Sequence, residues 1–71
     1  MSKFSPARLR RMRERKGWSR EQLAIRVGRG YQSVCLWERG TVTPPRSVQV
    51  RVASVLGIAL EDFLEQEVAD G

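Results

Sequence analysis

The stretch SREQLAIRVGRGYQSVCLWERG, residues 19–40, holds the side chains that folding alone explains least. Apolar residues recur there at helical spacing, and a glycine separates two short runs. In the second run, Tyr31, Gln32, Cys35 and Leu36 stand where a solvated helix face would normally carry charges. The sequence therefore raises the question of what this face contacts, if it faces neither water nor the core.

The rest of the composition argues against catalysis and metal binding. The chain has no histidine, and Cys35 is its single cysteine. The usual general base, the usual zinc ligands and any disulfide within the chain are therefore missing. No nucleophile is placed with a base. We expect a protein that is not an enzyme and has no cofactor, no metal site and no small-molecule ligand.

Charge is distributed very unevenly along the 71 residues. All 13 lysines and arginines lie in residues 1–51 with only three acids, whereas residues 52–71 carry five acids and no base. A basic body with an acidic end predicts a polyanionic partner for the body, although a basic surface can also be merely solvated. No apolar run approaches the length of about 18 residues that a membrane span needs. With no apolar N-terminal segment either, we expect a cytoplasmic protein that makes no membrane contact.

Capping signals and apolar periodicity predict the elements that must position these side chains. Ser5 followed by Pro6 begins a helix to Lys16, and the capping box Ser19-x-x-Gln22 begins a second helix. Apolar spacing continues the pattern to the end of the chain, with glycines at the helix ends. The expected fold is all-α, one domain over residues 1–71 with its core at about 5–64 and a frayed acidic tail at 65–71. Its five short helices are expected at about 6–16, 20–27, 31–39, 45–56 and 60–64, and no strand is expected.

Several of these residues together resemble a known family. The residues are LA at 23–24, Gly28, Ser33 and Val34, WERG at 37–40, Pro44 and VASVLGIALEDFL at 52–64. In this order and spacing they resemble the helix-turn-helix family of Cro and the lambda-type phage repressors (XRE-like). The resemblance covers about residues 5–64. It implies a lambda-repressor-like DNA-binding domain with a central helix-turn-helix.

The resemblance implies that helix 31–39 enters the major groove of DNA. Gln32 would then bond an adenine edge, and Leu36 or Cys35 would contact a thymine methyl group. Each residue also has a plainer interpretation. Tyr31 can pack against the second helix, Cys35 can be a small filler, and Gln32 and Leu36 can simply be exposed. The implied base-reading set is Gly30, Tyr31, Gln32, Ser33, Cys35 and Leu36.

The resemblance also implies contacts to the DNA backbone and one structural ion pair. Arg20 corresponds to a residue that holds phosphate, and Arg13 and Glu38 correspond to an ion pair that ties the first helix to the third. The chain departs from the family pattern at Arg29 and Gly30, where a small apolar residue and a Ser or Thr cap are usual. The resemblance implies phosphate contacts by Arg20, Arg39, Thr41 and Thr43. Arg46 is a nearby candidate, and Arg29 is expected to point toward DNA. Arg39, Thr41, Thr43 and Arg46 can also be ordinary surface residues.

The resulting hypothesis is a Cro-like, sequence-specific regulator of transcription that binds double-stranded operator DNA and acts as a repressor. It would lie on the nucleoid when bound. Reading two half-sites would require a homodimer on DNA, for which Leu64, Val68 and Ile25 are candidate interface residues. The alternative is an antitoxin or protein-interaction module that binds a partner protein through its acidic tail or through exposed apolar residues.

Overall fold

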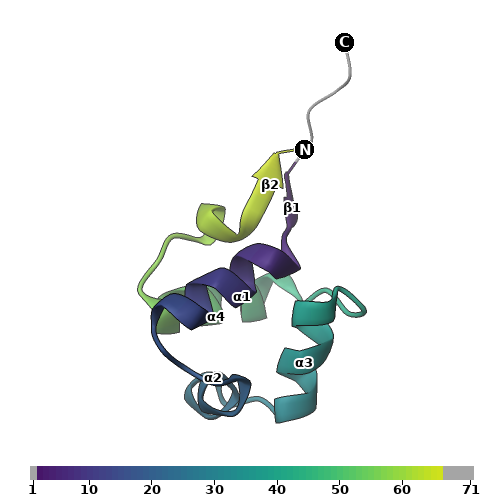
Figure 1. The fold of residues 1–71 in the computed structure, drawn as a ribbon. Helices are drawn as coiled ribbons and strands as arrows, with labels where there is room; N and C mark the ends of the chain where they lie inside the picture. The colour runs from purple at the N-terminus through teal and green to yellow at the C-terminus, as the bar shows by residue number, and fades with distance from the viewer. Residues whose placement is uncertain (1, 67–71) are drawn as a thin grey trace.

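The computed structural model describes residues 2–66 and consists of short helices packed around one core (Figure 1). The helix α1 crosses in front of α4, whereas α2 and α3 lie below them and a small two-stranded sheet lies above. In chain order the elements are β1 (Ser2–Phe4), α1 (Pro6–Arg15), α2 (Arg20–Val27), α3 (Tyr31–Arg39), α4 (Arg46–Leu56), the 3-10 helix η1 (Leu60–Phe63) and β2 (Leu64–Gln66).

The first two helices begin at the caps that the sequence predicts. The Ser5 side chain accepts a hydrogen bond from the backbone N–H of Arg8, and Pro6 occupies the first helical position. At α2 the capping box is complete. The Gln22 backbone N–H donates to Ser19 Oγ at 3.1 Å, and Gln22 Oε1 accepts from the Ser19 N–H at 2.8 Å. These bonds satisfy backbone donors that a helix start would otherwise leave unpaired.

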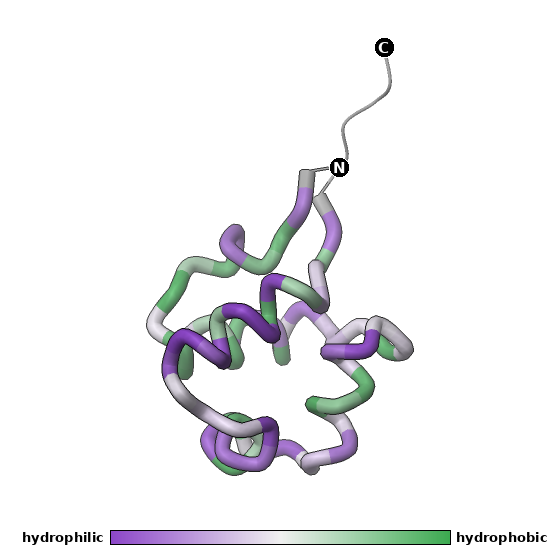
Figure 2. Tube along the Cα trace, viewed as in Figure 1, coloured by the Kyte–Doolittle hydropathy of each residue, from purple (hydrophilic) through white to green (hydrophobic). Residues whose placement is uncertain are grey.

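One apolar core joins all the helices. The fully buried side chains include Leu9 of α1, Leu23 of α2, Val34 of α3 and Phe63 of η1. Along the chain, Figure 2 shows apolar segments alternating with strongly hydrophilic ones, most of all in α1. Because each helix supplies only a few apolar residues, the stability of these short helices depends on mutual packing more than on helix propensity.

The two ends of the described chain form a sheet that the sequence analysis did not predict. β1 and β2 pair antiparallel, with Ser2 opposite Gln66 and Phe4 opposite Leu64. The expectations of no strand and of a frayed tail beginning at residue 65 were therefore wrong, and residues 67–71 lie outside the described residues. The pairing joins segments some sixty positions apart, so no local pattern signals it.

The fifth predicted helix is a 3-10 turn, η1, rather than a full α-helix. It begins after Ala59, whose backbone N–H donates to the Asp62 carboxylate at 3.1 Å, and it ends at Phe63. The ring of Phe63 packs against the ring of Phe4 with 5.6 Å between centroids. The helical class and the order of the helices are as predicted, and residues 2–66 contain four α-helices and this shorter fifth element.

A buried amide fixes the loop between α3 and α4. Gln49 of α4 is buried, and its Nε2 donates to the carbonyl of Pro44 at 2.8 Å. At the other end of the loop, the N–H groups of Thr41 and Val42 donate to the carbonyl of Leu36. The loop that carries Thr41 and Thr43 is therefore held at both ends.

Candidate nucleic-acid interface

A tight turn sets the angle between α2 and α3. Gly28 adopts a left-handed conformation with φ of +77°, and the N–H groups of Gly28 and Arg29 both donate to the carbonyl of Ala24. Beyond the turn, Gly30 caps α3 without a side-chain hydrogen bond, although its carbonyl accepts from the N–H groups of Ser33 and Val34. Buried apolar residues on both helices then fix their relative position: Leu23, Ala24, Val27, Val34 and Trp37.

The uncharged face of α3 borders an open depression of about 530 Å³. Tyr31 is 48% exposed and Gln32 is exposed, whereas Cys35 and Leu36 are half-buried. The α3 face is therefore largely accessible, and Tyr31 combines this exposure with a contact to Arg20 of α2. The side chains around this depression, which we call the reading depression, come from three helices: Arg10, Arg20, Tyr31, Gln32, Cys35, Leu36, Glu38 and Arg39.

Four of the six predicted base-reading residues therefore meet around one depression. These are Tyr31, Gln32, Cys35 and Leu36, whereas Gly30 and Ser33 lie at the start of α3 and do not line it. The pattern of exposure follows from helix geometry, because residues three and four positions apart share a face. The structure thus supports a common outward face, and which of these residues contacts a base stays a prediction.

A buried carboxylate joins three helices beneath this face. Glu38 of α3, with a side chain only 3% exposed, accepts two hydrogen bonds from Arg13 of α1: from Nε at 2.6 Å and from Nη2 at 3.0 Å. Arg13 also donates from Nη1 to the carbonyl of Trp18 at 2.7 Å. The ion pair that the family resemblance implies is therefore present, and every donor nitrogen of Arg13 is used.

Arg20 adds a third partner to this ion pair. Its Nε lies 3.2 Å from Glu38 Oε1, and its side chain is 41% exposed. Hydrogen bonds with Glu38 and then with Tyr31 raise the pKa of Arg20 above its already high ordinary value. Arg20, predicted as a phosphate contact, is thus tied to the interior through Nε, while the rest of its guanidinium borders the reading depression.

The remaining predicted phosphate contacts are exposed but are not gathered at one place. Arg39 borders the reading depression, and Thr43 borders a larger one of about 770 Å³ between β1, α1 and the loop after α3. Arg29, Thr41 and Arg46 are exposed and line neither depression. Contact of any of these side chains with DNA stays a prediction.

Comparison with known proteins agrees with this geometry. The family described as helix-turn-helix domain matches residues 7–65. The chain belongs to the helix-turn-helix family. A solved structure, described as a hypothetical transcription factor, NHTF, from Neisseria, matches with a TM-score of 0.80 and 32% sequence identity, over 84% of this chain and 69% of that chain. A search of curated proteins gave no match.

Membership in the helix-turn-helix family makes this chain a DNA-binding regulator in broad class. The two helices of the motif correspond here to α2 and α3. In the part of the chain that the structure describes, no helix has the length and apolar character of a membrane span, and no cluster of three possible metal ligands occurs.

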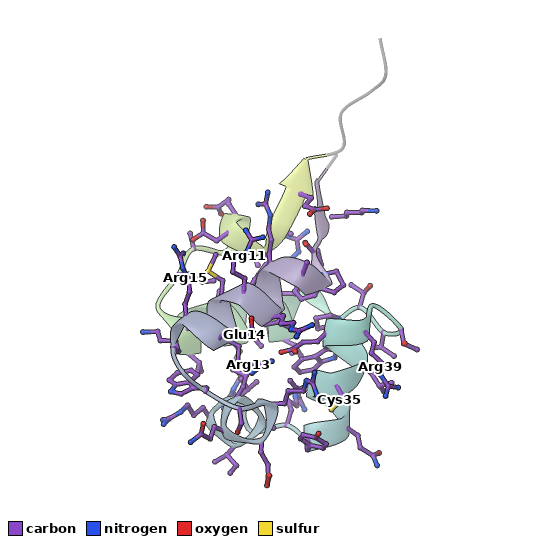
Figure 3. The ribbon with its side chains drawn as sticks, in the orientation of Figure 1. Arg11, Arg13, Glu14, Arg15, Cys35 and Arg39 are labelled. Carbon is purple, nitrogen blue, oxygen red and sulfur yellow. The ribbon has the colours of Figure 1, made fainter. Side chains whose placement is uncertain are left out.

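One side chain that borders the reading depression, Arg10, was not among the residues predicted from the sequence to contact DNA. Arg10 borders the reading depression although it belongs to α1, outside the two helices of the motif. Its position was in principle readable, because it precedes Arg13 by three residues and so lies on the same side of α1. Figure 3 shows the two sides of α1. Arg13 and Glu14 are directed toward α2 and α3, whereas Arg11 and Arg15 are directed toward η1.

The three candidate dimer residues have different surroundings. Ile25 of α2 is 77% exposed, the largest exposed fraction among the exposed large apolar residues. Leu64 is half-buried in β2, where it pairs with Phe4, and Val68 lies outside the described residues. A role of any of the three in dimer formation stays a prediction.

Proposed function

We propose that this helix-turn-helix domain reads duplex DNA by inserting α3 into the major groove, and that it represses transcription by occupying an operator. The observation that carries the proposal is the outward face of α3, where Tyr31, Gln32, Cys35 and Leu36 form an uncharged surface. Arginines border this surface. A centre of hydrogen-bonding and apolar groups with cations around it suits binding in a DNA groove, where bases lie in the middle and phosphates at the edges.

The side-chain chemistry of α3 fits particular base edges. The amide of Gln32 carries a donor and an acceptor, which match N7 and the amino group of adenine. Leu36 and Cys35 are suited to the thymine methyl group, and Tyr31 can bond either a base edge or a phosphate. Gly30 and Ser33, at the N-terminal end of α3, would lie close to the base pairs because recognition helices enter the groove by that end.

The cations around α3 would hold the DNA backbone. Arg20 and Arg39 border the reading depression, and the exposed Arg29, Thr41, Thr43 and Arg46 lie on the turn before α3 and on the segment after it. Contacts of this kind provide affinity that does not depend on sequence, whereas the base contacts provide the preference among sequences. Both are needed for an operator-binding regulator.

In this proposal the protein binds its operator as a homodimer, with one subunit on each half-site. Two copies related by a two-fold axis would place their α3 helices in successive major grooves, about 34 Å apart. Ile25 is the most exposed apolar candidate for the contact between copies.

Selection of binding sites from random duplexes, combined with the mass of the selected complex, tests the proposal directly. We expect a short enriched sequence, repeated as two inverted half-sites, in a complex that contains two chains. No enrichment, together with a stoichiometric complex with another protein, would contradict groove reading and would support the alternative of an antitoxin or protein-interaction module.

A further inference from the structure

We propose that Arg10 of α1 contacts a DNA phosphate next to the groove that α3 reads, so that the DNA-binding surface extends beyond the helix-turn-helix to a third helix. The inference rests on the proposed function and adds a residue to it. Three observations support it: the position of Arg10, the free donors of its guanidinium and the charge around it.

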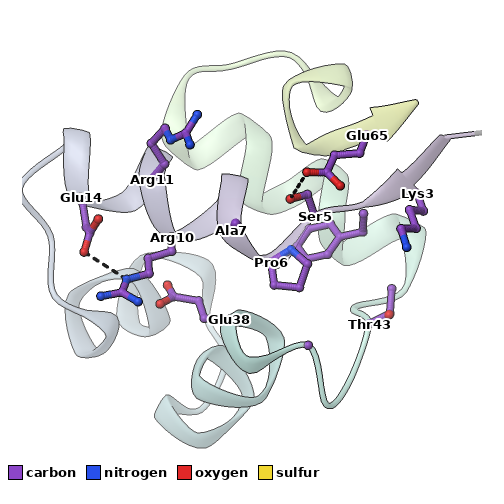
Figure 4. Close-up of a pocket in the computed structure, with 12 residues that line it drawn as sticks. Lys3, Ser5, Pro6, Ala7, Arg10, Arg11, Glu14, Glu38, Thr43 and Glu65 are labelled. Carbon is purple, nitrogen blue, oxygen red and sulfur yellow. Dashed lines mark hydrogen bonds and ion pairs between the residues drawn. The ribbon is translucent and has the colours of Figure 1, made fainter. Parts of the chain in front are cut away.

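The position of Arg10 connects the open surfaces of this side of the molecule. Its side chain borders the reading depression, the larger depression near β1, and a third one of about 380 Å³ at the start of α2. Within residues 2–66, Arg10 is the one residue that lines all three. Figure 4 shows Arg10 extending from α1 toward Glu38, with Glu14 beside it and Arg11 directed the other way. A DNA strand that lies along the α3 face would therefore pass within reach of Arg10.

The guanidinium of Arg10 has donors to offer. Its Nε lies 3.2 Å from Glu14 Oε2, and within residues 2–66 neither terminal nitrogen has a hydrogen-bond partner. Two of the other arginines of α1 differ, because Arg13 uses all its donor nitrogens and Arg8 donates from Nη1 to the carbonyl of Leu64. The remaining two, Arg11 and Arg15, make no side-chain hydrogen bond within residues 2–66 but are directed away from α2 and α3 (Figure 3). The planar fork of an arginine whose terminal nitrogens are free matches the paired oxygens of a phosphate.

The charge around Arg10 favours an anion. Arg20 and Arg39 border the same depression, while the buried carboxylate of Glu38 is already shared between Arg13 and Arg20. The carboxylate of Glu14 remains as the nearest opposing charge. Its pair with Arg10 is exposed, with 59% and 55% of the two side chains accessible, and such surface pairs are weak. A phosphate can therefore bind Arg10 without first breaking a strong contact.

The test compares Arg10→Gln with Arg15→Gln on the duplex chosen by the selection experiment. Both substitutions remove one positive charge from an exposed arginine of α1, but Arg15 lines none of the three depressions. We expect Arg10→Gln to weaken binding about fivefold on preferred and unrelated duplexes alike, and to make the slope of log K against log salt shallower by about 0.9. Arg10→Lys, which keeps the charge, should restore the slope.

Equal effects of Arg10→Gln and Arg15→Gln on affinity and slope would overturn the inference, because both would then reflect only the overall charge. Loss of preference for one base pair in Arg10→Gln would also overturn it, since a phosphate contact carries no sequence information. A wild-type chain that fails to bind any duplex would instead refute the proposed function itself. Thermal unfolding of each variant confirms that the comparison is made on folded protein.

Discussion

At the scale of single residues, the surface and the interior of this domain use arginine in opposite ways. Arg13 is buried, and all its donor nitrogens bond Glu38 or the carbonyl of Trp18, so its role is structural. Arg10 is exposed, and its terminal nitrogens have no hydrogen-bond partner in the described part of the chain. Arg20 does both, since it is tied through Nε to Glu38 and is partly exposed beside α3. The family resemblance assigns Arg13 to an ion pair and Arg20 to a phosphate contact, whereas the position of Arg10 and the bond of Arg20 to Glu38 come from the structure.

Gln32 is the residue through which base preference should be most visible. We expect Gln32→Ala to cost about 1–3 kcal/mol of binding free energy on the preferred duplex and to relax the choice at a single base pair. Arg20→Ala should instead weaken binding to all duplexes more evenly. Binding titrations on a set of single-base variants of the selected site measure both effects. A uniform loss for Gln32→Ala would contradict a base contact.

Glu38 should be the most sensitive charged residue for folding. Glu38→Gln leaves the cation of Arg13 buried without its counter-charge, and we expect a loss of about 3–5 kcal/mol in the free energy of unfolding. Urea denaturation measures the change. Glu14→Gln, which removes an exposed carboxylate from α1, is the matched control and should change stability by no more than about 0.5 kcal/mol. Equal effects of the two substitutions would contradict a structural role for the Glu38 pair.

The raised pKa of Arg20 does not make this ion-pair group sensitive to pH near neutrality. A pKa that is higher in the folded state than in the unfolded state adds stability that is fully present below the unfolded value. That stability is lost only as the pH rises through the folded value. For an arginine this range lies far above physiological pH, so Arg20 stays charged and paired wherever the protein functions.

At the scale of elements, the sequence predicts helices well because their ends carry local signals. α2 and α3 have the predicted bounds, and α1 and α4 differ from prediction by one residue at one end. Ser5, Ser19 and the left-handed glycines act within one turn of their own position, so they can be read from the sequence. The strand pair depends on contacts between distant segments, which no local pattern contains, whereas the side of α1 on which Arg10 lies follows from its spacing to Arg13.

Two glycines of the turn should respond differently to substitution. Gly28 has φ of +77°, so Gly28→Ala should lower the free energy of unfolding by about 1–2 kcal/mol. Gly30 has φ of −73°, and an added Cβ would meet no atom within 4 Å. Gly30→Ser should therefore supply the missing cap of α3 and raise stability by a few tenths of a kcal/mol, about the measured difference between serine and glycine caps. Thermal or urea unfolding distinguishes these outcomes, and a destabilised Gly30→Ser variant would contradict the assigned cap.

At the scale of the whole molecule, positive and negative charges lie on different elements. The helices that border the reading depression belong to the basic part of the chain, whereas η1 and β2 carry the acids Glu61, Asp62 and Glu65. A polyanion would be attracted to the former and repelled by the latter, which favours approach with α3 foremost. This asymmetry provides orientation before any specific contact forms.

The proposed contacts imply a steep dependence of DNA affinity on salt. Four predicted arginine contacts to phosphate, with or without Arg10, give a slope of log K against log salt of about −3 to −5. Titrations at several salt concentrations on preferred and random duplexes measure it, with a short single-site duplex to keep one complex per molecule. A slope near zero would contradict backbone binding by these arginines.

The pairing of Ser2 with Gln66 places the two ends of the described chain side by side, on the opposite side of the molecule from the first turn of α3 (Figure 1). This arrangement is well suited to backbone cyclisation. A covalent link between residues 1 and 71 would reduce the entropy of the unfolded chain more than that of the native one, in which β1 and β2 already lie side by side. We expect the cyclic protein to unfold at a higher temperature and to keep its DNA affinity. A melting temperature equal to that of the linear chain would show that the strand pair is open in solution.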